Sequence, residues 1–124
     1  MKNLLFSIIA LLLMSCYNQE RNCKDFRTGK FRSTFVINGK KTIVDFERKD
    51  SLEIETFRGK TDTAIVRWVN DCEYVITKKT PKTVQEKKSV VMRIISTTQN
   101  SYRFEYNLVG SENKQKGEAF KIDL

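Results

Sequence analysis

The chain has 124 residues, of which 40% are hydrophobic and 31% charged, and it carries a formal net charge of +8 at pH 7 with no histidine. This length suits one small domain with a single core. The absence of histidine excludes the common forms of Ser-His-Asp and Cys-His nucleophile activation and removes a frequent metal ligand. We therefore expect a protein that is not an enzyme and that holds no metal or cofactor, although catalysis by paired carboxylates stays formally open.

An apolar run over residues 4–14 follows one positive charge, Lys2. The run is too short to span a bilayer core, which needs roughly 20 apolar residues, so it predicts a signal peptide rather than a transmembrane helix or a buried core element. It ends in Leu13-Met14-Ser15-Cys16, which resembles the bacterial lipobox. The resemblance implies cleavage after residue 15, a diacylglycerol on the sulfur of Cys16 and acylation of its new amino group.

The next residues, 16–22, are short and polar and predict a lipidated tether, after which residues 23–124 form a single β domain. More than one acyl chain on Cys16 would anchor the protein stably to a membrane. Tyr17 and Asn18 after the lipidated cysteine favour the outer membrane in the envelope of a Gram-negative-type bacterium.

Two further cysteines, Cys23 and Cys72, remain after lipidation of the first. They form an even pair in a compartment where disulfides persist, and a bridge between them would close a loop of about 50 residues. A reactive thiol or a metal site is the alternative, but the pair lacks CxxC spacing. We predict a structural disulfide.

From residue 29 onward, short segments rich in β-branched and aromatic residues alternate with turn signals, which predicts an all-β domain. Asn38-Gly39 suits the positive φ values of a type I′ hairpin turn. In the third segment, alternation predicts that Leu52 and Ile54 face the core while Glu53 and Glu55 face water. The predicted strands span residues 29–37, 42–48, 52–57, 63–69, 72–77, 89–97, 102–109 and 118–122.

The connection that contains Thr80 and Pro81 permits two interpretations. A Thr N-cap with Pro at the first helical position predicts a short helical turn within residues 80–88, whereas the lysine content equally indicates a solvated loop. The lysines of this region form a candidate basic patch: Lys78, Lys79, Lys82, Lys87 and Lys88. Such a patch would suit anionic lipid headgroups, an acidic glycan or an envelope protein, while nucleic acid is not expected as a partner of an exported protein.

Most of the predicted reversals are of hairpin length, and hairpins join antiparallel neighbours. A long meander with two open edges would invite aggregation. We therefore predict an up-and-down antiparallel meander that closes into a small lipocalin-like barrel of approximately eight strands.

The segments NCKDFRTGKF (22–31) and WVNDCEY (68–74) resemble a family of small uncharacterised bacterial lipoproteins, and the similarity spans nearly the whole mature chain. Some members of that family carry the name of a DNA topoisomerase IV subunit, which the export signal and the short length argue against. The resemblance implies no catalytic or binding residues.

Phe26-x-x-Gly29-x-Phe31 also resembles the Gly-x-Trp opening of lipocalins and fatty-acid-binding proteins. That resemblance implies an internal pocket for an apolar ligand. The residues that would line it are Phe31, Phe35, Ile54, Trp68, Tyr74, Met92, Phe104 and Tyr106. The alternative, which we favour for so short a chain, is that these side chains fill the core.

These observations predict a non-enzymatic, lipid-anchored envelope protein that acts as a binding or scaffolding module for another envelope component. The alternative is a lipocalin-like carrier of a small apolar ligand. An internal void bordered by aromatic residues would favour the carrier, an exposed apolar or basic patch the scaffold, and two converging carboxylates in a cleft an enzyme.

Overall fold

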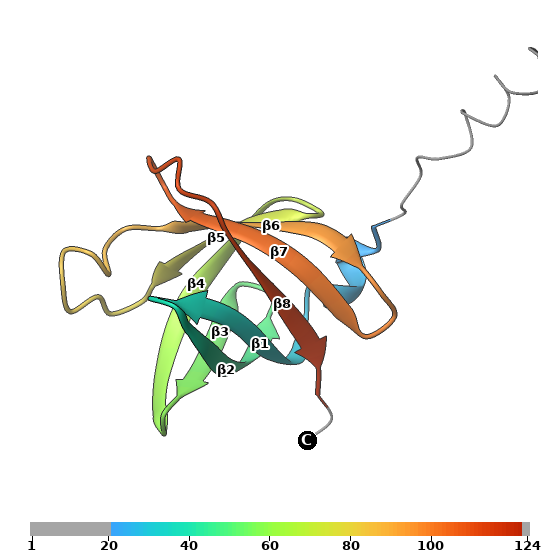
Figure 1. Cartoon of the computed structure of the whole chain (residues 1–124), viewed down its shortest axis with the longest axis horizontal. Coiled ribbons are helices and arrows are strands. Elements are labelled where there is room, and N and C mark those ends of the chain that lie inside the picture. Colours follow the sequence, from blue (N-terminus) through green and yellow to red (C-terminus); the bar gives the residue numbers. More distant parts are fainter. Residues whose placement is uncertain (1–20, 123–124) are drawn as a thin grey trace, which may run out of the picture.

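A computed structural model describes residues 21–122 of the chain as a closed antiparallel β barrel (Figure 1). The barrel has eight strands in sequence order, which confirms the predicted meander and its closure. The predicted signal peptide, the lipidated Cys16 and most of the tether lie outside the described residues. Among residues 21–122 no helix is long and apolar enough to cross a membrane.

Strand β1 pairs with both β2 and β8, which closes the barrel. The strands are β1 (Gly29–Ile37), β2 (Lys40–Lys49), β3 (Leu52–Phe57), β4 (Lys60–Asn70), β5 (Glu73–Lys78), β6 (Val90–Thr97), β7 (Ser101–Leu108) and β8 (Gln115–Lys121). The bounds of β1 and β3 agree with the prediction, and the others differ by a few residues at their ends because hairpin pairing extends into residues that alternation alone leaves undecided.

Two tight turns of the same kind join β1 to β2 and β3 to β4. Asn38 and Gly39 have φ values of 50° and 77°, and Arg58 and Gly59 have φ values of 49° and 75°. Positive φ at both central residues is the signature of a type I′ turn, whose twist matches paired antiparallel strands. The Asn-Gly prediction is confirmed, whereas the predicted loop over residues 58–62 is shorter than expected because β4 begins at Lys60.

The connection between β5 and β6 contains a hydrogen-bonded turn and no helix, so of the two interpretations of residues 80–88 the loop is confirmed and the helical turn is not. The amide of Glu86 donates to the hydroxyl of Thr83, and the Glu86 carboxylate accepts from the amide of Lys82. Side chains therefore satisfy backbone groups that a helix would pair internally, which gives the segment an alternative to helix formation.

A 3-10 helix that was not predicted, η1 (Cys23–Phe26), covers one end of the barrel (Figure 1). The disulfide between Cys23 and Cys72 links this helix to the turn before β5, with a Cα–Cα distance of 5.2 Å, and the predicted pairing is confirmed. The ring of Phe26 is fully buried and lies 5.1 Å from that of Tyr102. We call this end of the barrel the closed end.

We call the opposite end of the barrel the open end. The β1–β2 and β3–β4 turns and the β5–β6 and β7–β8 connections lie there.

Strand β3 runs from the closed to the open end, and its faces are the reverse of those predicted. Glu53 is buried inside the barrel with 3% of its surface exposed, Glu55 lines the barrel cavity, and Leu52 and Ile54 are only half-buried. The prediction assumed that charged side chains face water, but Glu53 is directly opposite Arg48 in the β2–β3 register, and an ion pair makes burial of both tolerable.

Candidate functional site

The closed end is filled around Arg48, which is 1% exposed. Its Nε donates to Glu53 at 3.1 Å and its Nη1 to the carbonyl oxygen of Phe26 at 2.8 Å. Its Nη2 donates to the hydroxyls of Tyr74 at 2.6 Å and Tyr102 at 3.0 Å. The guanidinium thus fastens β2 to β3, β5, β7 and the 3-10 helix.

The guanidinium of Arg48 stays charged although it is buried. Burial alone would lower the pKa of Arg48, but the oxygens of Tyr102, Tyr74 and Glu53 raise it well above its ordinary value. For Tyr74, burial has the opposite effect: it raises the pKa of the phenol well above its ordinary value, so the phenol stays neutral. Glu53 offsets the charge and four acceptors take four of the five N–H donors, so Arg48 offers an anionic ligand at most one further hydrogen bond and no unbalanced charge.

Above this network the barrel holds a cavity of about 410 Å³, which lies within the usual range for small-molecule sites. Its lining side chains come mainly from seven strands, β1 to β7. The apolar and aromatic lining consists of Phe35, Val44, Phe46, Ala64, Tyr74, Ile76, Val90, Met92, Tyr102, Phe104, Tyr106 and Leu108. The predicted filled core therefore describes the closed end only, and the rest of the interior is hollow.

The structure brings together five of the predicted pocket residues: Phe35, Tyr74, Met92, Phe104 and Tyr106. Phe31 and Trp68 pack in the core of the closed end instead. Ile54 does not line the cavity, because the faces of β3 are reversed.

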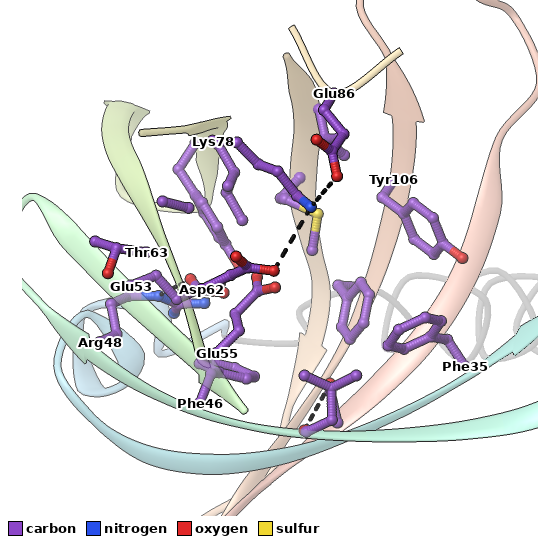
Figure 2. Close-up of a pocket in the computed structure, with 18 of the residues that line it drawn as sticks. Phe35, Phe46, Arg48, Glu53, Glu55, Asp62, Thr63, Lys78, Glu86 and Tyr106 are labelled. Atoms are coloured by element: carbon purple, nitrogen blue, oxygen red, sulfur yellow. Dashed lines mark hydrogen bonds and ion pairs between the residues drawn. The ribbon is translucent and has the colours of Figure 1, made fainter. Parts of the chain in front are cut away.

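Charged side chains lie at the open end of the cavity (Figure 2). Glu55 on β3 and Asp62 on β4 are directly opposite each other in the strand register. The Nζ of Lys78 lies 2.8 Å from Glu86 and 3.7 Å from Asp62. Figure 2 shows Lys78 between Glu86 and Asp62, with Glu55 below them.

Glu55 differs from Glu53, Asp62 and Glu86 because its carboxyl group forms no ion pair within residues 21–122 and lies beside the carboxyl group of Glu53. Burial, and then the nearby Glu53, raise the pKa of Glu55 from 4.5 to about 8. The Lys78 ammonium opposes this shift but does not cancel it. Glu55 is therefore largely protonated at neutral pH.

The structure distributes the five predicted patch lysines between the cavity and the outer loop. Lys78 is half-buried and faces the cavity, where Glu86 and Asp62 offset its charge. Lys88 lines the open end and is exposed, and the exposed members Lys79, Lys82 and Lys87 lie on the outer loop. The unshared positive charge of this region is thus smaller than the sequence indicates.

The residues that sequence reasoning missed are the charged side chains of the cavity lining: Arg48, Glu53, Glu55 and Asp62. A signal for Asp62 was present, because alternation places it on the same face as Ala64, a small apolar residue that is buried in the structure. Among residues 21–122 no group of three or more Cys, Asp or Glu side chains has an arrangement that could hold a metal ion.

The fold and this interior define the class of the protein: a small antiparallel β barrel with a plugged end, a buried arginine network and an internal cavity open at the other end. Comparisons with protein-family models, with curated proteins and with solved structures found no match to the chain.

Proposed function

We propose that this protein binds a small, largely apolar molecule inside its barrel and that it does so as a lipid-anchored envelope protein. The observation that carries the proposal is the cavity of about 410 Å³, which has aromatic and aliphatic walls and a charged rim. Such a lining favours burial of an apolar body, while the few polar groups fix its orientation. We propose no catalytic activity.

Anchoring through Cys16 would set the direction in which the cavity opens. The described chain begins at the closed end, where Arg21 donates to the carbonyl oxygen of Ile94 and the Asn22 amide donates to Thr97. The six residue steps from Cys16 to Asn22 reach at most about 22 Å when fully extended. The closed end would therefore face the anchoring membrane, and ligand would exchange at the open end, away from it.

The binding test uses the mature chain with Cys16→Ser, so that no acyl chain competes for the cavity. The probe is N-phenyl-1-naphthylamine, a neutral apolar dye whose fluorescence rises in apolar surroundings. We expect saturable binding of one dye per protein, confirmed by native mass spectrometry. Absence of saturable binding would overturn the proposal.

Two neighbouring residues on β6 give a matched pair of variants. Val90 lines the cavity, whereas Val91 does not and is turned to the outer face. Val90→Trp fills part of the cavity and should weaken dye binding by about tenfold or more, since a single lost contact of 1.4 kcal/mol already has that effect. Val91→Trp should bind like the parent, and equal binding by both variants would show that the dye sits elsewhere.

A scaffolding role is the second candidate, and the outer surface supports it. Val36 and Ile43 are 55% and 52% exposed on neighbouring strands, and Phe120 on β8 is 42% exposed. Exposed apolar groups of this size are common on interaction surfaces. Chemical cross-linking of the lipidated protein in its envelope, with and without Ile43→Lys, would test whether this face contacts a partner.

Lipid anchoring is tested separately from binding. Wild-type protein should partition into detergent and carry the added mass of acyl chains, whereas the Cys16→Ser variant should be released with the soluble fraction. Equal partitioning of the two forms would contradict the anchor.

A further inference from the structure

We propose that the natural ligand of this cavity is a monocation, a molecule with an apolar body and one ammonium group that pairs with the carboxyl group of Glu55. This inference rests on the proposed function and names the chemical class of the ligand.

The strand register places two acidic side chains against each other at the open end of the cavity. Glu55 and Asp62 are directly opposite across β3 and β4, and both line the cavity. Directly opposed side chains on one face of a sheet lie about 5 Å apart at Cβ, and like charges in that arrangement are destabilising. A cation placed between the two carboxyl groups would reverse the sign of this interaction.

The cavity lining has more acidic than basic groups, although the chain as a whole carries a net charge of +8. Four carboxyl side chains and three basic side chains line it. Arg48 pairs with Glu53, and Lys78 is shared by Asp62 and Glu86. Lys88 is exposed at the rim and forms no ion pair within residues 21–122. Lys78 acts on Glu55 only from beyond ion-pair distance, so the carboxyl group of Glu55 has no cation in direct contact.

In the empty cavity a proton takes the place of that cation, in agreement with the raised pKa of Glu55. An alkylammonium would replace it: the carboxyl group loses its proton to solvent, and the carboxylate pairs with the ammonium of the ligand. Charge is conserved in this exchange, because one proton leaves for each monocation bound. Burial away from water strengthens such a pair relative to one on the surface.

The cavity is less suited to an anionic ligand. Arg48 and Glu53 are the buried charged side chains in the described part of the chain, and the guanidinium is already held by four acceptors. At the rim an anion would meet Asp62 and Glu86 beside Lys78. A fatty carboxylate would therefore lack a free buried cation.

The experiment compares three ligands with the same ten-carbon chain: decylammonium, decanol and decanoate. Each displaces N-phenyl-1-naphthylamine from the Cys16→Ser protein at about pH 8.5, where Glu55 is largely ionised and an alkylamine is still charged. We expect decylammonium to bind about tenfold or more tightly than decanol, and decanoate to bind most weakly. Tighter binding of decanoate or decanol would overturn the head-group assignment and leave the proposed function intact.

Glu55→Gln removes the carboxylate and should abolish the preference for decylammonium over decanol, with the affinity of the dye for the variant measured first so that both displacements can be converted to affinities. The matched control is Glu112→Gln, which makes the same change on the exposed β7–β8 connection and should keep the preference. A preference that survives Glu55→Gln would overturn the inference. Failure of the dye to bind wild-type protein would instead refute the proposed function.

The proton exchange gives an independent readout. From about pH 6 to about pH 8 the affinity for decylammonium should rise by up to tenfold per pH unit, and then level off as Glu55 ionises in the empty protein. The affinity for decanol should not rise over this range, because decanol does not displace the proton. A flat pH profile for decylammonium would contradict the pairing with Glu55.

Discussion

The carboxyl group of Glu55 should make the stability of this barrel fall as pH rises through the neutral range. Glu55 lines the cavity and has a pKa of about 8 in the folded protein, against an ordinary value of 4.5. Glu55→Gln is the perturbation of choice, because the amide has nearly the same shape and carries no charge at any pH.

The sign follows from the number of protons bound. Between pH 4.5 and about 8 the folded protein holds a proton on Glu55 that the unfolded chain has released. The free energy of unfolding therefore falls by about 1.4 kcal/mol per pH unit within this window. The contribution of Glu55 is greatest below pH 4.5 and is lost as pH rises through about 8.

Over the accessible interval from about pH 5 to about pH 8, the loss amounts to roughly 3 to 4 kcal/mol, which is a large part of the 5–15 kcal/mol typical of a domain. Other titrating groups contribute to the wild type and to the variant alike, so the difference between the two isolates Glu55. We expect wild-type protein to lose stability relative to Glu55→Gln by this amount.

The assay is urea unfolding, monitored by the fluorescence of Trp68, at four pH values between about 5 and about 8. Glu112→Gln serves as the control and should follow the wild type at every pH. Parallel curves for wild type and Glu55→Gln, within about 0.5 kcal/mol, would refute the reasoning, because extrapolated free energies carry errors near that size. So would a wild-type protein that gains stability relative to the variant as pH rises.

The remaining predictions concern the disulfide, the packing of Gly117 and the Arg48–Glu53 ion pair, and each is measured by urea unfolding. Replacing Cys23 and Cys72 by serine should lower the free energy of unfolding by about 4 kcal/mol, and a loss below about 1 kcal/mol would show that the bridge constrains little. Gly117→Ala should lower it by about 1–3 kcal/mol, because a Cβ there overlaps the ring of Phe104, and adding Phe104→Leu should restore most of the loss. Arg48→Met should cost about 3–5 kcal/mol, because it leaves a buried carboxylate unpaired, whereas replacing both members of the ion pair by methionine should cost much less.

Much of the fold could be predicted because its determinants are local. Alternation over residues 29–37 and 102–109 sets which side chains share a face, and Asn38-Gly39 determines a turn that returns the chain antiparallel. The Cys23–Cys72 bridge followed from counting cysteines once Cys16 was assigned to lipid.

The candidate site was predicted only in part, because alternation does not say which face of a strand is inside. In β3 the two faces carry Leu52 and Ile54 on one side and Glu53 and Glu55 on the other, and hydrophobicity alone favours the first pair. The outcome depends on Arg48, whose position opposite Glu53 is a property of the β2–β3 register.

By itself the sequence determined the number of strands, their order and the pairing of the cysteines, because each of these depends on neighbouring residues or on composition. Only the tertiary structure decided that the barrel is hollow at one end and that charged side chains lie within it. Closure of β1 against β8 brings together side chains that are far apart in the chain, and the volume left between them depends on all of these side chains at once.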